Sequence, residues 1–144
     1  MKKEQGFTLI ELMIVVSIIA IIAAIAIPSL MNARKSGNEA SAISSLRTLT
    51  TVNEQYRNRF QEYAGSLANL SAAGYIDSVL GAQVKSGYSF NYVRGAATTN
   101  TWTCNANPTV AGTTGDRYFY VDQSGVIRFN GTAAASSTDS PIDQ

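Results

Sequence analysis

The chain has 144 residues with 11 basic and 10 acidic side chains, which suffices for one domain but gives no basic surface for a nucleic acid. It has no histidine, so the commonest general base and metal ligand is absent. Its single cysteine, Cys104, excludes a disulfide within the chain.

The N-terminal segment is first basic and then apolar. Lys2 and Lys3 precede a run from Leu12 to Ala33 that carries no charge. A helix of about 20 apolar residues crosses a bilayer, so this run can span a membrane once, with its basic end in the cytoplasm. A secretory signal peptide is an alternative, although such signals usually have a shorter apolar core. A single membrane anchor with no further role is another.

One acidic residue, Glu11, lies at the start of the apolar run. A carboxylate is costly near the centre of a bilayer, and the cost falls toward the interface. Glu11 therefore either extends its side chain to the interface or has a partner. The pattern alone leaves both open.

The N-terminal residues "KKEQGFTLIELMIVVSIIAIIAAIAIP" closely resemble the start of a type IV prepilin. That family has a short basic leader ending in Gly, then Phe, then Thr-Leu-Ile-Glu, then an apolar helix interrupted by Pro. The matching positions are Gly6, Phe7, Glu11 and Pro28. The resemblance covers roughly residues 1–35, and the pseudopilins of type II secretion share it.

The resemblance implies a processing route. A prepilin peptidase would cut between Gly6 and Phe7 on the cytoplasmic side, and the new amine of Phe7 would be methylated. Residues 7 and 11 lie on one face of a helix, so Glu11 could pair with the amine of its own Phe7. In a fibre it could reach the Phe7 amine of a neighbouring subunit instead, which is the arrangement that the family implies for register.

Pro28 lies where the helix continues. It cannot donate to the carbonyl of Ala24, which predicts a kink or an easily stretched segment between Ala23 and Pro28. The resemblance implies that this segment loses helicity when the fibre assembles.

Beyond Pro28 the helix becomes amphipathic and is expected to run to about Phe60. Apolar residues recur at gaps of three and four and predict one stripe that needs a sheet to cover it. The predicted stripe consists of Ala33, Ala40, Ile43, Leu46, Leu49, Val52, Tyr56 and Phe60. The remaining faces carry the charges, Glu39 among them.

The C-terminal half predicts a short helix and a small sheet. Ser66 and Gly74 are the expected caps of a helix from Leu67 to Ala73. "GYSFNYV", "TWTCNA" and "RYFYVDQSGVIRF" predict strands, the last as two strands joined by a turn at 122–125. "NANPTVAGTTGD" is expected to be a loop and the segment from residue 131 a mobile tail.

No catalytic, cofactor or metal site emerges from these residues. Without histidine there is no ordinary Ser-His triad. Asp77, Asp116, Asp122 and Asp139 are scattered and each is expected beside a turn. Cys104 is expected to be a buried small hydrophobe on a strand. We therefore expect a protein that is not an enzyme.

The predicted fold is α+β: a long N-terminal α-helix, with a transmembrane half and an amphipathic half, packed on an antiparallel sheet of three to four strands. Residues 1–6 are the expected leader, 7–30 the transmembrane and assembly helix, and 31–144 the globular head with the amphipathic half of the helix.

The resemblance implies a structural subunit of a bacterial type IV pilus, held in the inner membrane before assembly and then in a surface filament. Its implied partners are copies of the same subunit, prepilin peptidase and the inner-membrane assembly machinery. The charge balance alone gives no evidence of a nucleic-acid partner. A pseudopilin of a type II secretion system is the first alternative. A soluble periplasmic domain behind a signal peptide is the second.

Overall fold

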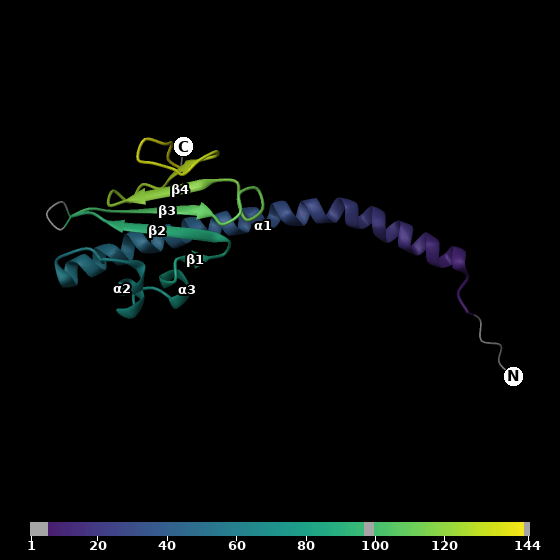
Figure 1. The fold of residues 1–144 in the computed structure, drawn as a ribbon, viewed down its shortest axis with the longest axis horizontal. Coiled ribbons are helices and arrows are strands. Elements are labelled where there is room, and N and C mark those ends of the chain that lie inside the picture. The colour runs from purple at the N-terminus through teal and green to yellow at the C-terminus, as the bar shows by residue number, and fades with distance from the viewer. Residues whose placement is uncertain (1–5, 97–99, 143–144) are drawn as a thin grey trace. The chain divides into compact units, whose positions relative to one another are not determined.

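The computed structural model describes residues 6–96 and 100–142. The chain divides into two compact units between residue 34 and residue 35. Helix α1 (Leu9–Phe60) runs through this boundary without interruption. Figure 1 labels the helices and most of the strands.

In the first unit the described residues are helical from Leu9 onward, and their apolar side chains are exposed. None of the most apolar part of α1 is buried, and by length and composition this part can cross a membrane. Ser17, a hydroxyl within this apolar helix, donates to the carbonyl of Met13 over 2.8 Å. That bond satisfies the hydroxyl without any outside partner.

The second unit contains the other helices and the sheet. After α1 come α2 (Leu67–Ala72), α3 (Ser78–Gly81), β1 (Val84–Lys85), β2 (Tyr88–Arg94), β3 (Trp102–Pro108), β4 (Tyr118–Asp122) and β5 (Arg128–Asn130). The five strands are antiparallel to their neighbours and follow chain order across the sheet. The fold is therefore α+β, as predicted.

The sheet has five strands rather than three to four. The additional strand is β1, which has two residues and pairs with β2 across a tight turn. Ser86 and Gly87 form that turn with φ values of 49° and 72°. Positive φ at both positions matches the twist of a two-residue hairpin. Two residues are too few to give the alternation by which a strand is recognised in a sequence.

The local signals for α2 and for the turn after β4 are confirmed. Ser66 caps α2 by accepting from the N–H of Asn69, and Gly74 follows the helix with a φ of 79°. Gly125, at 76°, closes the turn after β4, where its N–H donates to the carbonyl of Asp122 over 3.0 Å. The predicted loop at 105–116 begins later than expected, because β3 continues to Pro108.

One face of the sheet forms the core together with the second half of α1. Buried side chains alternate with less buried ones along β2 and β3. The register places Tyr92 opposite Cys104, and Cys104 opposite Val121. The same cluster includes Leu46 and Leu49 of α1. The inward-facing side chains of the strands and the apolar stripe of α1 thus pack together in one layer.

The helical stripe is confirmed at its centre and wrong at its ends. Leu46, Leu49 and Val52 are buried, and Ile43 and Tyr56 are partly buried. Ala33, Ala40 and Phe60 are exposed. The buried face instead includes three polar residues, Glu39, Ser45 and Asn53.

Glu39 was expected on a solvent-facing side of the helix, and that expectation is wrong. Its Oε1 accepts from the backbone N–H groups of Asp116 and Arg117, over 2.9 and 3.1 Å. Its Oε2 accepts from Nε of Arg117 over 2.8 Å. These bonds fasten α1 to the loop before β4, and they satisfy a carboxylate that is 7% exposed.

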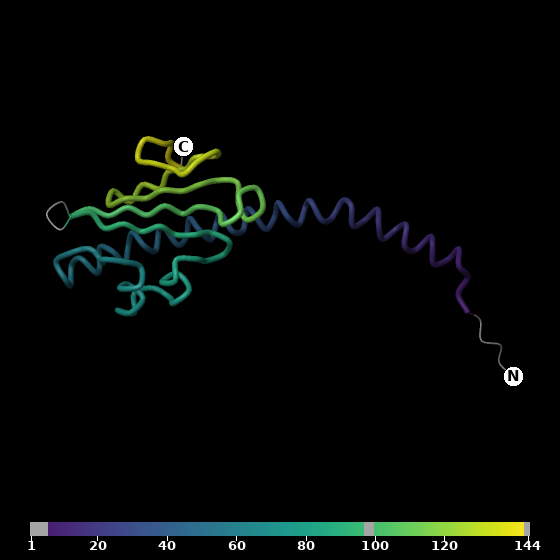
Figure 2. The backbone as a smooth tube through the Cα atoms, in the orientation of Figure 1, coloured from purple at the N-terminus to yellow at the C-terminus, as the bar shows by residue number. Residues whose placement is uncertain are grey.

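The expected mobile tail folds back on the sheet as far as residue 142, and the expectation is wrong there. The N–H of Ile142 donates to the carbonyl of Ile127, and the N–H of Phe129 donates to the carbonyl of Ser140, both over 3.0 Å. Asn105 donates to the carbonyl of Ala135 over 2.7 Å. The segment thus runs along β5 at the edge of the sheet (Figure 2, yellow), and its bond to Asn105 lies on the side of β3 that faces away from the core.

The bonds of Glu39 predict a large stability effect. Glu39→Ala leaves two backbone N–H groups and a guanidinium without their partner, so we expect the free energy of unfolding to fall by roughly 2–3 kcal/mol. Glu62→Ala is the control, because the Glu62–Arg94 pair is exposed and should contribute less than about 1 kcal/mol. Denaturant unfolding of the detergent-solubilised chain measures both. Equal losses for the two variants would contradict the role given to Glu39.

Candidate processing and assembly site

The predicted cleavage site lies in an open stretch before α1. Gly6 and Phe7 precede the helix, and the Phe7 side chain is 92% exposed. A Cβ on Gly6 would meet nothing within 4 Å, so the fold itself does not require glycine at this position. A requirement for glycine would have to come from an enzyme that receives the extended backbone. The leader residues Lys2 and Lys3 lie outside the described residues.

Glu11 belongs to a reciprocal cap at the start of α1. Its Oε2 accepts from the backbone N–H of Thr8 over 2.7 Å and from the Thr8 hydroxyl over 2.6 Å. The Thr8 hydroxyl in turn accepts from the N–H of Glu11 over 3.3 Å. This is a capping box, in which two side chains satisfy two N–H groups that the first turn leaves without partners.

The capping box was missed at the sequence level, although its signal is present. Thr8 and Glu11 have the Ser/Thr-x-x-Glu spacing, and an apolar run follows them. Glu11 therefore has a role within its own chain, because its carboxylate stabilises the start of α1. Its second oxygen, Oε1, accepts no hydrogen bond from the residues that the structure describes. That oxygen remains available to a donor from outside the chain.

The surroundings of Glu11 are apolar and open. A groove beside it is lined by Phe7, Leu12, Ile14 and Val15. Once water is removed, an unpaired carboxylate next to such a surface is costly. The site therefore favours a partner that brings a positive charge to Glu11. The groove and Glu11 together can accept an apolar segment that brings a cation with it.

Pro28 lies within α1, which is helical on both sides of it. The helix is therefore not broken at Pro28, and the predicted weak point consists only of a missing backbone hydrogen bond. Proline has no N–H, so the carbonyl of Ala24 lacks the bond that the ladder would otherwise supply. Pro28 itself is exposed.

The remaining candidates have structural roles. Asp77 caps α3, Asp116 pairs with Lys35 over 3.1 Å, and Asp122 and Asp139 accept bonds from nearby turn residues. Among the described residues, no three His, Cys, Asp or Glu side chains are grouped so that they could hold a metal ion. Burial raises the pKa of the Cys104 thiol to about 12, so it stays protonated as a small buried hydrophobe.

The N-terminal segment matches a known family model. Residues 1–27 match the model described as the prokaryotic N-terminal methylation motif. The match includes Gly6, Phe7 and Glu11 and ends before Pro28.

A curated relative extends the similarity beyond this motif. Over 74 residues, 51% of this chain, the sequence is 32% identical to the type IV wide pilus major component PilA4 of Thermus thermophilus. The chain spans 56% of the length of that relative. The chain thus carries the N-terminal methylation motif of prepilin-type proteins and is similar, over half of its own length, to a type IV pilin.

Proposed function

We propose that this protein is a structural subunit of a bacterial type IV pilus. The proposal rests on the exposure of the first half of α1. This part of the helix is apolar, carries no charge from Leu12 to Ala33, and is not covered by the other described residues of the chain. Such a surface requires lipid or other helices around it. The methylation motif and the similarity to a pilus component favour a polymer of the same subunit as its final environment.

The subunit waits in the membrane before it assembles. The apolar half of α1 spans the inner membrane, with the basic leader on the cytoplasmic side. The inner-membrane assembly machinery then transfers the subunit to a surface filament, where neighbouring helices replace lipid. The role is structural, without catalysis by the subunit.

Processing makes a new cation beside Glu11. A prepilin peptidase cuts between Gly6 and Phe7, and the amine of Phe7 is then methylated. The exposure of both residues ahead of α1 supports access by such an enzyme. An α-amino group is largely protonated near neutral pH, since its reference pKa is about 7.7–8.0.

Glu11 then sets the register between subunits. Its Oε2 keeps the capping box with Thr8, while Oε1 accepts from the Phe7 amine of a neighbour. In a bundle of apolar helices an unpaired carboxylate is costly, so the staggers that bring the two charges together are favoured. Cap and pair do not compete, because each uses a different oxygen of the carboxylate.

Pro28 lets the helix adapt during assembly. The segment before it has one backbone bond fewer than a regular helix, so it stretches at lower cost. This allows the subunits to change their rise along the fibre while α1 beyond Pro28 stays helical.

The first prediction concerns processing. Mass spectrometry of protein taken from the membrane and from sheared filaments should show a chain that begins at Phe7 and carries one additional methyl group. Gly6→Leu should abolish cleavage because the side chain obstructs an extended backbone in a protease cleft, whereas a Cβ at this position meets nothing within 4 Å in the fold. A mature chain that begins near Ile27 would indicate an ordinary signal peptidase and would refute the proposal.

The second prediction concerns Glu11. Glu11→Leu should leave membrane insertion intact, since a charged group leaves the apolar segment, but should strongly reduce the filament yield. Glu11→Asp keeps the charge with a shorter reach and should give a milder defect. The measurement is the amount of subunit in sheared filaments relative to the amount in the membrane.

Ser17→Ala is the matched control for Glu11→Leu. It also removes a polar group from the apolar helix, but the Ser17 hydroxyl is already satisfied by Met13 of the same chain. Its filament yield should equal that of the parent. A normal yield from Glu11→Leu, with the altered subunit confirmed inside the fibre, would show that Glu11 acts only as a cap.

A further inference from the structure

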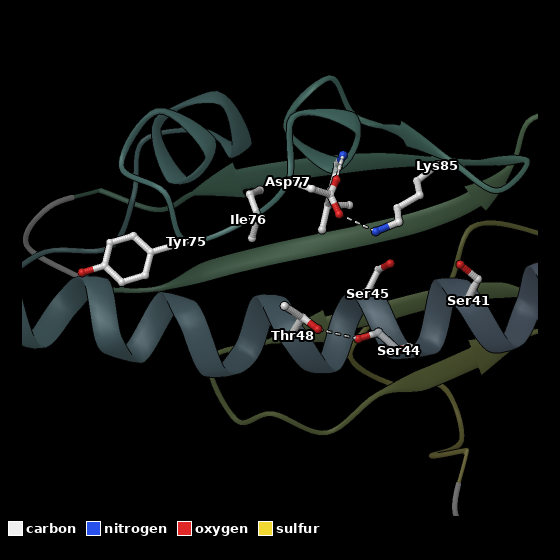
Figure 3. A pocket seen from close by; sticks show the side chains of 9 residues that line it. Ser41, Ser44, Ser45, Thr48, Tyr75, Ile76, Asp77 and Lys85 are labelled. Atoms are coloured by element: carbon white, nitrogen blue, oxygen red, sulfur yellow. Dashed lines mark hydrogen bonds and ion pairs between the residues drawn. The ribbon is translucent and has the colours of Figure 1, made fainter.

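A cavity lined with hydroxyl groups lies in the second unit, between α1 and the segment that carries α3 and β1 (Figure 3). Its volume is about 290 Å³. Ser41, Ser44, Ser45 and Thr48 line it from α1. This volume is at the lower end of the range for ligand pockets, so it suits one small molecule rather than a chain.

The Ser45 hydroxyl distinguishes this cavity from an ordinary polar groove. Ser45 is 6% exposed, and its side chain points into the cavity. Its Oγ has no hydrogen-bond partner among the residues that the structure describes. Among the described residues, the fully buried side-chain atoms without a partner are Nε1 of Trp102 and Oδ1 of Asn107, so the Ser45 Oγ is open to the cavity. Water satisfies it in the free protein, and a ligand hydroxyl can replace that water. The cavity is where that partner would lie.

The other hydroxyls retain capacity for a ligand. Ser41 donates to the hydroxyl of Ser86 over 3.0 Å, and Thr48 donates to the carbonyl of Ser44 over 3.0 Å. Each of these two hydroxyls can still accept a bond, because a hydroxyl has two lone pairs. The α1 wall therefore offers both donors and acceptors at close spacing.

The charged residues at the cavity neutralise each other. Nζ of Lys85 lies 2.6 Å from Oδ2 of Asp77, whose Oδ1 also accepts from the N–H of Leu80 over 2.7 Å. The bond from Lys85, followed by that from Leu80, lowers the pKa of Asp77, so the pair stays ionised. A ligand therefore meets no net charge, and neither an anion nor a cation is favoured.

The segment opposite α1 also contributes apolar side chains beside the Asp77–Lys85 pair. Tyr75 and Ile76 line the cavity, and both are packed against the core. An edge-on contact with Tyr56, with the ring centroids 5.8 Å apart, holds the ring of Tyr75. A ligand that matches both walls needs several hydroxyls on one side and C–H groups on another.

We propose that this cavity binds the ring of a neutral hexopyranose. Such a ring carries hydroxyls that both donate and accept, has C–H groups that can lie against Tyr75 and Ile76, and has no charge. Ser45 donates to one ring hydroxyl or accepts from it. The proposal concerns the second unit alone and does not depend on polymerisation.

Saturation-transfer NMR tests this binding on the full chain, in micelles of a zwitterionic detergent without a sugar head group. The probes are glucose, galactose and mannose, each as the free sugar and as its methyl pyranoside. We expect transfer from at least one of them, with a dissociation constant on the order of 1 mM, as befits a ligand of this size. Glucuronate and glucosamine should bind more weakly because their charge finds no partner.

The two forms of each sugar distinguish two sources of the ligand. Binding of the methyl pyranoside as well as the free sugar supports the terminal residue of a glycan, because the anomeric oxygen is then substituted. Binding of the free sugar alone supports a soluble monosaccharide. Absence of transfer from all neutral probes would mean that the cavity holds only water and would overturn the proposal.

Ser45→Ala is the decisive variant. It should weaken sugar binding roughly two- to tenfold, since one hydrogen bond is lost, while the thermal midpoint stays equal or rises because the hydroxyl has no partner in the fold. Thr48→Val, which preserves shape, should also weaken binding. Ser36→Ala, an exposed serine elsewhere on α1, should change neither property. Unchanged affinity in both cavity variants would refute the assignment.

Discussion

The main physical constraint on this protein is an apolar helical segment that the described residues of its own chain do not cover. The run from Leu12 to Ala33 carries no charge, and its large apolar side chains are exposed. The second unit, in contrast, buries an aromatic and aliphatic core between the later part of α1 and one face of the sheet. Apolar surface is therefore buried within the second unit and left exposed on the first. On this account the first unit obtains its cover from lipid and then from copies of itself.

Much of the fold could be predicted because its signals are local and periodic. Leu46, Leu49 and Val52 follow the helical period, and Tyr88, Phe90 and Tyr92 follow the strand period. Glu39 and the C-terminal segment could not be placed in this way. Their burial depends on backbone donors at residues 116 and 117 and on the outer face of the sheet, which come close only after folding. For Glu39 a hint existed, since it lies seven residues before Leu46 and fourteen before Asn53, on the buried face.

The sequence proposed the residues of the candidate site but not the contacts that they make in the structure. The spacing of Gly6, Phe7 and Glu11 directed attention to a segment that the methylation motif also covers, and the roles of these residues stay predictions. The capping box between Thr8 and Glu11 could have been predicted from the same segment, and it gives the carboxylate a structural role within the chain. One oxygen of the Glu11 carboxylate already has its partner within the chain. The hydroxyl cavity at Ser45 gives no sequence signal, because its second wall comes from residues 75–85.

The most direct measurement of the central claim is the behaviour of a truncated chain that begins at Pro28. It lacks most of the exposed apolar run and keeps every residue of the core. We predict that it is soluble without detergent and monomeric by size-exclusion chromatography with light scattering, while the chain that begins at Phe7 requires detergent. If the truncated chain aggregates without detergent or forms filaments by itself, then the assembly surface lies in the second unit and the account is wrong.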